Sequence, residues 1–159
     1  MLRLKEVGVV NLVKKVPVSR VLVPQKILAA ADLARLASAN RPYKWGGSTP
    51  AGFDCSGFVA YVFDQVLGTG NPPRVTAEGL YTSHLFSKVL GAPQPGDLIF
   101  FSDNGTTATH VAILASGNRF IGSQSSTGVA YVHLENPYWR KKILGYRRWA
   151  GVMGKVVSQ

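Results

Sequence analysis

The chain has 159 residues, of which 46% are hydrophobic and 16% are charged, so it has the length and composition of one globular domain with its own core and not of a disordered protein. Eighteen Lys and Arg against eight Asp and Glu give a formal net charge of +10, which attracts polyanions such as nucleic acid, anionic lipid or an acidic cell-wall polymer. One cysteine excludes an internal disulfide, and one Cys with three scattered His gives no recognisable zinc spacing. We therefore expect no metal and no cofactor, and no RNA- or DNA-binding motif is found.

The first 23 residues are basic and rich in β-branched side chains. Residues 16–23 partly alternate, which is typical of a short edge strand or an extended arm. The apolar run 7–13 is followed at once by Lys14 and Lys15 and by no small-residue cleavage site. It therefore has the features of neither a signal peptide nor a membrane span, and we expect a basic N-terminal arm over 1–23.

The first predicted helix covers residues 25–37 and starts at Pro24, because apolar residues recur there at helical spacing among many alanines. A loop rich in Gly, Ser and Pro follows at 43–50. Further on, residues 71–73 predict a turn, and residues 76–88 predict a short helix.

The second half of the chain predicts a run of strands with short connections. Helices followed by strands are typical of an α+β fold with an antiparallel sheet on one side. The expected elements are strands at 98–101, 109–114, 119–124, 129–134 and 143–149, with a helical turn at 137–140.

Cys55 lies where the loop gives way to an apolar run that Gly68 ends. This pattern predicts a buried helix that begins at Asp54 or Cys55. A thiol at a helix N-terminus faces unpaired backbone N–H groups and the positive end of the helix dipole, which favour the thiolate. We therefore expect a lowered thiol pKa and a nucleophilic Cys55; the alternative is a small buried hydrophobic residue.

A nucleophilic cysteine needs a base, usually a histidine brought close by the fold. His110 begins a predicted core strand, on which it points to the face opposite Thr109 and Val111. The alternative for His110 is a hydrogen-bonded edge histidine. We interpret His84 as a surface or packing residue and His133 as a surface residue.

Four ordered sequence blocks carry a resemblance to a known family. In their order and spacing they resemble the NlpC/P60 family of papain-like cysteine peptidases, over about residues 24–150. The blocks are Tyr43-x-Trp45-Gly46-Gly47, Phe53-Asp54-Cys55-Ser56-Gly57-Phe58-Val59, Pro95-Gly96-Asp97-Leu98-Ile99-Phe100-Phe101 and Thr109-His110-Val111-Ala112-Ile113.

The resemblance implies a papain-like α+β core, with helices packed on an antiparallel sheet and the nucleophile at a helix N-terminus. It places a catalytic domain at 24–150 and a C-terminal tail at 151–159. Family members mostly hydrolyse amide bonds in peptidoglycan stem peptides, often between D-glutamate and the following diamino acid. Cys55 would then form the acyl-enzyme, and His110 would act as general base and acid.

Three further residues match positions that line the substrate site in some family members: Tyr43, Asp54 and Ser56. The resemblance implies that they hold a free amino group of the stem peptide. Asp54 can pair with an ammonium, and the two hydroxyls can accept its hydrogen bonds. The alternative for Asp54 and Ser56 is helix capping.

The chain departs from the family at the polar residue, commonly His, that orients the base. The corresponding position is Gly122, which has no side chain. On a regular strand Gln124 points to the same face, so its amide can orient His110 instead; a backbone carbonyl near Gly122 is the alternative. Histidine introduced at position 122 is expected to hold or raise activity.

Two other functions stay open at this stage. The chain could be a thiol amidase or acyltransferase that acts on another amide or ester. It could also be a catalytically weak wall-binding module of a phage or a secretion apparatus. We expect the site of action to be the bacterial envelope or the extracellular space, with delivery by a phage or as an effector as one open route. The +10 charge favours binding to anionic wall polymers.

Overall fold

The structure, a computed structural model, describes residues 18–68 and 76–149. Its helices are α2 (Val18–Ala37), α3 (Cys55–Leu67), α4 (Ala77–Tyr81) and α5 (Pro137–Arg140). Its strands are β1 (Ser48–Thr49), β2 (Gly52–Phe53), β3 (Phe86–Lys88), β4 (Leu98–Phe101), β5 (His110–Ala115), β6 (Arg119–Gln124), β7 (Gly128–His133) and β8 (Ile143–Trp149).

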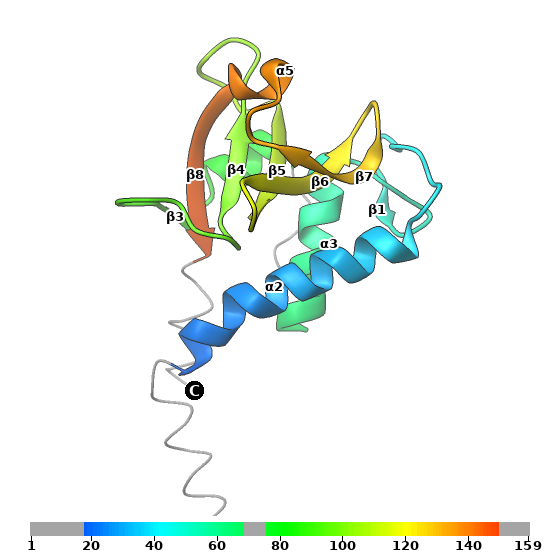
Figure 1. Cartoon of the computed structure of the whole chain (residues 1–159), viewed down its shortest axis with the longest axis horizontal. Helices are drawn as coiled ribbons and strands as arrows, with labels where there is room; N and C mark the ends of the chain where they lie inside the picture. The colour runs from blue at the N-terminus through cyan, green and yellow to red at the C-terminus, as the bar shows by residue number, and fades with distance from the viewer. Residues whose placement is uncertain (1–17, 69–75, 150–159) are drawn as a thin grey trace, which may run out of the picture.

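Six strands form one antiparallel sheet in the order β3-β8-β4-β5-β6-β7. Strands β4 to β7 follow one another along the chain as hairpins, and β8 returns to pair with β4 (Figure 1). Strands β1 and β2 form a separate two-stranded sheet just before α3. The predicted α+β class and antiparallel sheet are confirmed.

Helix α3 packs against β5 and β6, and α2 packs against α3, so the ribbons of the two helices cross in Figure 1. The large hydrophobic core lies between these helices and the sheet, with Phe58, Val62 and Phe63 of α3 fully buried in it. Burial of such side chains contributes about 1.5–3 kcal/mol each and fixes α3, and with it Cys55, on the sheet.

The N-terminal prediction was wrong for its described part, because residues 18–23 are the start of α2 and not an extended arm. The β-branched residues there suggested a strand, although Val18, Val21 and Leu22 also have helical spacing. Pro24 lies inside α2 and does not begin it. The remainder of the arm, residues 1–17, lies outside the described residues, as do the turn at 71–73 and the tail at 151–159.

The predicted short helix at 76–88 was wrong in its second half. Thr76 caps α4, which ends after five residues at Tyr81, and Phe86–Lys88 instead form β3 against β8. The other strands agree with their predicted positions to within a residue. Within the two described ranges, no helix has both the length and the apolar character needed to cross a bilayer.

Candidate active site

Asp54 fixes the point at which α3 begins. Its Oδ1 accepts a hydrogen bond from the backbone N–H of Gly57 at 2.7 Å, and its Oδ2 accepts one from Gly46 at 2.9 Å. Asp54 is therefore the N-cap, and Cys55 is the first residue of the helix, as predicted. Gly68, with a φ of 67°, is the predicted C-cap.

Two glycines let the preceding loop lie directly against this helix start. A Cβ on Gly57 would lie 2.0 Å from the carbonyl oxygen of Gly47, and one on Gly47 would lie 2.1 Å from that of Gly52. Any larger residue would push the loop away from α3. The glycines of the two sequence blocks thus hold the loop on the first turn that carries Cys55.

Ser123 on β6 ties the same loop to the sheet. Its buried hydroxyl donates a 2.8 Å hydrogen bond to the carbonyl of Phe53, two residues before Cys55. The sequence analysis missed this residue, because a lone serine in a strand gives no local signal for a partner 70 residues away. Ser123 therefore positions the cysteine relative to the strand pair β5–β6.

Cys55 is 8% exposed and lies in the main core, at the start of α3. Burial raises the pKa of its thiol, and the nearby Asp54 carboxylate adds to this. The backbone amides of Val111, Ser56 and Cys55 itself act in the opposite direction but are outweighed. The expected lowering of the pKa was therefore wrong for the resting site, because desolvation outweighs the helix terminus.

The His110 ring lies between aromatic side chains. Its centroid is 4.7 Å from that of Trp139 and 5.5 Å from that of Phe101. Burial lowers the pKa of His110 to about 4, against smaller opposing effects of Gln124 and Asp103. His110 is therefore a neutral imidazole at pH 7.

Gln124 makes the expected contact: its Oε1 lies 3.2 Å from Nε2 of His110. The partners of the Gln124 amide nitrogen determine which atom donates in this hydrogen bond. The Thr127 hydroxyl donates to the Gly128 carbonyl, so its oxygen accepts from Nε2 of Gln124, and the Ala130 carbonyl also accepts there. Oε1 thus faces His110 as an acceptor, so Nε2 of His110 carries the proton and Nδ1 has the lone pair of a base.

The register of β5 and β6 explains why residue 124 reaches the histidine. Ile113 pairs with Ile121, and the same antiparallel register places Gln124 opposite His110 and Gly122 opposite Ala112. A Cβ on Gly122 would lie 2.8 Å from both the Ala112 Cβ and the Gln124 Oε1. The expectation that histidine at 122 holds or raises activity is therefore withdrawn, because it would displace one of these groups.

The candidate substrate residues are divided between two places. Tyr43 lines a hollow of about 150 Å³ beside His110, together with Ser125 and Trp139. Asp54 and Ser56 are buried, and the Ser56 hydroxyl is 3.5 Å from Oδ1 of Asp54. The capping alternative for Asp54 is thus present in the structure.

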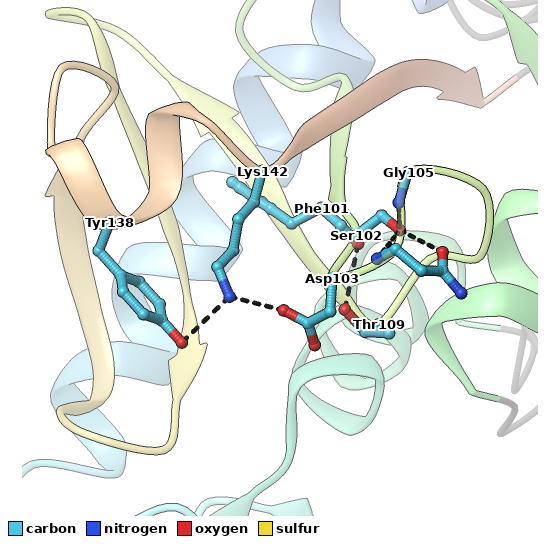
Figure 2. Close-up of polar contacts among 8 residues, drawn as sticks. Phe101, Ser102, Asp103, Gly105, Thr109, Tyr138 and Lys142 are labelled. Atoms are coloured by element: carbon cyan, nitrogen blue, oxygen red, sulfur yellow. Dashed lines mark hydrogen bonds and ion pairs between the residues drawn. The ribbon is translucent and has the colours of Figure 1, made fainter.

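The rim of the hollow beside His110 includes residues that the sequence analysis did not single out. Figure 2 shows Lys142 between Tyr138 and Asp103, and all three line the hollow together with His110. Lys142 and Asp103 are 39 positions apart, so no local motif indicates them. His84 and His133 are exposed, as predicted.

No group of three His, Cys, Asp or Glu side chains suited to a metal ion occurs in residues 18–68 and 76–149. The chemistry that the site itself offers is that of a thiol and a neutral imidazole. The sulfur lies at the amide of Val111, which follows His110 directly on β5. Nucleophilic cysteine chemistry needs two such groups, a thiol and a neutral imidazole that can take its proton.

The sequence model of the NlpC/P60 family matches residues 40–148 of this chain. The chain belongs to the NlpC/P60 family. The matched residues include the loop, the Cys55 helix and the strands that carry His110 and Gln124.

Several curated relatives support this membership. The chain is 38% identical over 108 residues to a probable peptidoglycan endopeptidase LytE of Bacillus subtilis, which covers 68% of this chain and 30% of the relative. It is 41% identical over 130 residues to a gamma-DL-glutamyl hydrolase of the same species, and the aligned region covers 76% of this chain and 30% of that relative. The chain therefore spans about 30% of the length of these relatives.

Solved structures of the family share the fold. A Staphylococcus aureus protein described as similar to a lipoprotein of the NLP/P60 family has a TM-score of 0.63 and 36% identity, over 80% of this chain and 41% of its own. The NlpC/p60 domain of the peptidoglycan hydrolase SagA has a TM-score of 0.55 and 34% identity, over 70% of this chain and 90% of its own. The papain-like core predicted for this chain thus agrees with solved family members.

Proposed function

We propose that this NlpC/P60 protein is a cysteine peptidase that hydrolyses γ-D-glutamyl amide bonds to a diamino acid in peptidoglycan stem peptides. The observation that carries the proposal is the His110–Gln124 hydrogen bond on the strand pair beside Cys55. It supplies an oriented, neutral base although this chain has Gly122 where the family commonly has a polar residue that orients the base. The names of the relatives, a peptidoglycan endopeptidase and a γ-glutamyl hydrolase, support the substrate class.

The first chemical step is proton transfer from the thiol of Cys55 to Nδ1 of His110. The resting pair is neutral, since burial raises the pKa of the thiol and lowers that of the imidazole. The thiolate attacks the γ-carbonyl carbon, and imidazolium then gives its proton to the departing amine. Water hydrolyses the resulting thioester, with His110 again as base.

The first turn of α3 also provides for the negative oxygen of the tetrahedral intermediate. The backbone amides of Cys55 and Ser56 lie close to the sulfur. They point from a helix N-terminus, where the dipole favours negative charge. Donors placed in this way stabilise charge that develops only in the transition state.

Substrate binding is assigned to the groups beside this centre. Tyr43 lines the hollow next to His110 and contacts the substrate there. Asp54 and Ser56 are assigned to the substrate's amino group, while Asp54 also caps α3. The positive charge of the chain holds it on anionic wall polymers, and its site of action is the envelope or the extracellular space.

A second candidate substrate is a γ-linked polymer of glutamate. The relative named gamma-DL-glutamyl hydrolase is 41% identical to this chain and supports it. The scissile bond has the same γ-glutamyl carbonyl, and only the leaving residue differs. The catalytic roles of Cys55, His110 and Gln124 are the same for both substrates.

The test is digestion of purified peptidoglycan and of poly-γ-glutamate, with the product masses determined. The proposal expects peptidoglycan fragments that end in γ-D-glutamate and others that begin with the diamino acid. Products from the glutamate polymer alone would select the second candidate. No products from either substrate, with a folded protein, would support a wall-binding module or an acyltransferase instead.

A further inference from the structure

The indole of Trp139 lies with its flat face against the His110 ring. The two ring centroids are 4.7 Å apart, and the planes are 33° from parallel. Trp139 is nearly perpendicular to the other aromatic rings that it contacts. The interplanar angles are 81° with Phe101, 82° with Phe120 and 85° with Tyr138. Among the described residues, His110 is thus the ring that the indole face covers.

Trp139 separates the imidazole from solvent. His110 is 8% exposed, whereas Trp139 is only partly buried and lines the same hollow. The other aromatic neighbour of the imidazole, Phe101, is fully buried, with its centroid 5.5 Å from that of His110. Loss of the indole would therefore open the His110 ring to water from the hollow.

The backbone that carries the indole is held at both ends. Oδ1 of Asn136 accepts hydrogen bonds from the amides of Tyr138 at 3.0 Å and Trp139 at 3.3 Å. The amide of Lys142 donates to the carbonyl of Trp139 at 2.9 Å. The amide of Ser102, directly after β4, donates to the carbonyl of Lys142 at 2.8 Å. Helix α5 is thus tied to the end of the sheet where β4 ends and β8 begins (Figure 1).

An imidazole that acts as a base needs more than one constraint. The hydrogen bond between Nε2 of His110 and Oε1 of Gln124 fixes which edge of the ring faces β6. One hydrogen bond leaves the ring free to tilt about that contact. A flat side chain on the ring face restricts the tilt, and it leaves Nδ1 open because both nitrogens lie on the ring edge.

The same contact keeps water from the imidazole. Burial is the main cause that lowers the pKa of His110 to about 4, and the hydrogen bond to Gln124 acts in the opposite direction. Because the partly exposed Trp139 covers one face of the ring, a large part of this burial depends on the indole.

Titratable groups from several other segments also face His110. Those that line the hollow with it are Tyr43, Asp103, Tyr138 and Lys142. Asp103 and Lys142 form an ion pair at 2.6 Å, and the effect of Asp103 on the pKa of His110 is smaller than that of burial. The thiol of Cys55 is neutral at rest, because burial raises its pKa. Replacement of Trp139 leaves all of these groups in the chain.

We propose that Trp139 is a positioning residue, whose indole face holds the plane of the His110 ring and keeps water from it. This inference rests on the proposed function, in which His110 takes the proton of Cys55. The indole itself transfers no proton, because its N–H is a donor only. Trp139 thus acts on the reaction through the base.

The variants separate the indole face from general packing. Trp139→Leu removes the flat face, and Trp139→Phe keeps one of smaller area. Phe120→Leu is the matched control, because Phe120 belongs to the same small cluster and its ring contacts are with Phe101 and Trp139 and not with His110.

Two measurements are made on each folded variant. The pKa of His110 is measured by an NMR titration of its imidazole, which needs no activity, and the exposed His84 and His133 give reference signals in the same protein. Steady-state kinetics on a γ-D-glutamyl peptide of a diamino acid then give kcat and KM separately.

Trp139→Leu is expected to raise the pKa of His110 by about one pH unit or more, because water reaches the ring. Its kcat should fall about tenfold with KM within about twofold of the wild type, because a misplaced base slows the chemical step. Trp139→Phe should keep kcat within about threefold, with a smaller rise in the pKa. Phe120→Leu should lose stability without a change in the pKa of His110.

Three results would overturn the inference while the proposed function stands. They are a pKa of His110 that stays at the wild-type value in both Trp139 variants, an equal rise in Phe120→Leu, and a rise in KM with kcat unchanged, which would make Trp139 a substrate contact. If Trp139→Leu does not fold, the pKa and kcat of Trp139→Phe decide alone. No cleavage by the folded wild-type protein would overturn the proposed function, and the NMR titration would still decide whether the indole keeps water from His110.

Discussion

The two faces of the six-stranded sheet differ in what they contribute. The face covered by α2 and α3 has the large core, whereas the opposite face has a small cluster of Ile99, Phe101, Ala112 and Phe120, with Trp139 packed on it. Strand alternation produces the division, because Leu98 and Phe100 join the large core and their neighbours join the small cluster. One face holds most of the core that stabilises the domain, and the aromatic residues of the other face pack against His110, the proposed base.

The two faces meet at β5, and the chemistry needs both. Val111 packs in the large core with Cys55, while His110 lies against the aromatic rings of the other face. The sulfur lies at the Val111 amide, so it is close to the backbone that leads to the base. The proposed nucleophile and the proposed base thus belong to separate packing units that one strand, β5, joins.

The largest expected effect follows removal of the nucleophile. Cys55→Ala should lower kcat/KM by at least about 10⁴-fold, since single losses from a catalytic unit have effects of this size or larger. Its melting temperature should change little, because the side chain is small. Peptide hydrolysis followed by product mass checks the first part, and thermal denaturation checks the second. Residual activity within tenfold of the wild type would remove Cys55 from the mechanism.

Phe63→Ala tests the packing on the face of the sheet that α2 and α3 cover. This ring is fully buried and packs 5.6 Å from Phe86 and 5.7 Å from Trp149. Phe63→Ala should lower the free energy of unfolding by about 3–5 kcal/mol, because it loses burial and leaves a cavity. Urea denaturation measures the loss. Activity per folded molecule should stay near that of the wild type, and a larger loss of activity than of folded protein would contradict the division between the faces.

Gln124 tests the other face. Gln124→Ala should lower kcat by about 10- to 100-fold, part of what general acid–base catalysis contributes, because the His110 ring loses its orienting partner. Gln124→Glu keeps an acceptor for His110 but loses the N–H groups that Thr127 and Ala130 accept, so it should recover only part of the rate. Steady-state kinetics of the two variants decide this. If Gln124→Ala has the wild-type kcat, a backbone group orients the imidazole instead.

The burial of His110 predicts a dependence of stability on pH. Its folded pKa, about 4, lies below the usual value of 6.5, so the unfolded chain binds more protons between these pH values. Stability from this group is complete above pH 6.5, falls with pH through the window, and is lost near pH 4, by at most about 3 kcal/mol. Denaturation curves at pH 7.5 and 5 should differ less for His110→Leu than for the wild type. An equal pH dependence of the two proteins would contradict the buried, neutral imidazole.

The smallest expected effect concerns the net charge of the protein and does not involve the two faces of the sheet. Binding to isolated wall sacculi should weaken as salt rises from about 0.05 to 0.5 M, because exposed charges are screened over about 10 Å at 0.1 M. A co-sedimentation assay with Cys55→Ala measures binding without digestion. Binding that salt leaves unchanged would show that the net charge of +10 is not what holds the protein there.

The sequence predicted the parts of the site that local pattern encodes. Asp54, Cys55 and Gly68 mark their helix because capping residues and an apolar run are local signals. Strand alternation was enough to propose the contact between Gln124 and His110. It could not establish that contact, because the cross-strand register depends on tertiary pairing. Burial around Cys55 has no local signal, so the helix terminus suggested a lowered pKa where desolvation raises it. Asp103 and Lys142 meet only through the fold.

The most direct test of the account is covalent capture of the nucleophile by a substrate-shaped electrophile. A γ-D-glutamyl peptide in which a diazomethyl ketone replaces the scissile amide is incubated with the wild-type protein, and the modified residue is mapped by peptide mass spectrometry. The account predicts one adduct, on Cys55, with a rate that falls strongly in His110→Ala. An adduct on another residue, or labelling of Cys55 that is equally fast without His110, would contradict the Cys55–His110 mechanism.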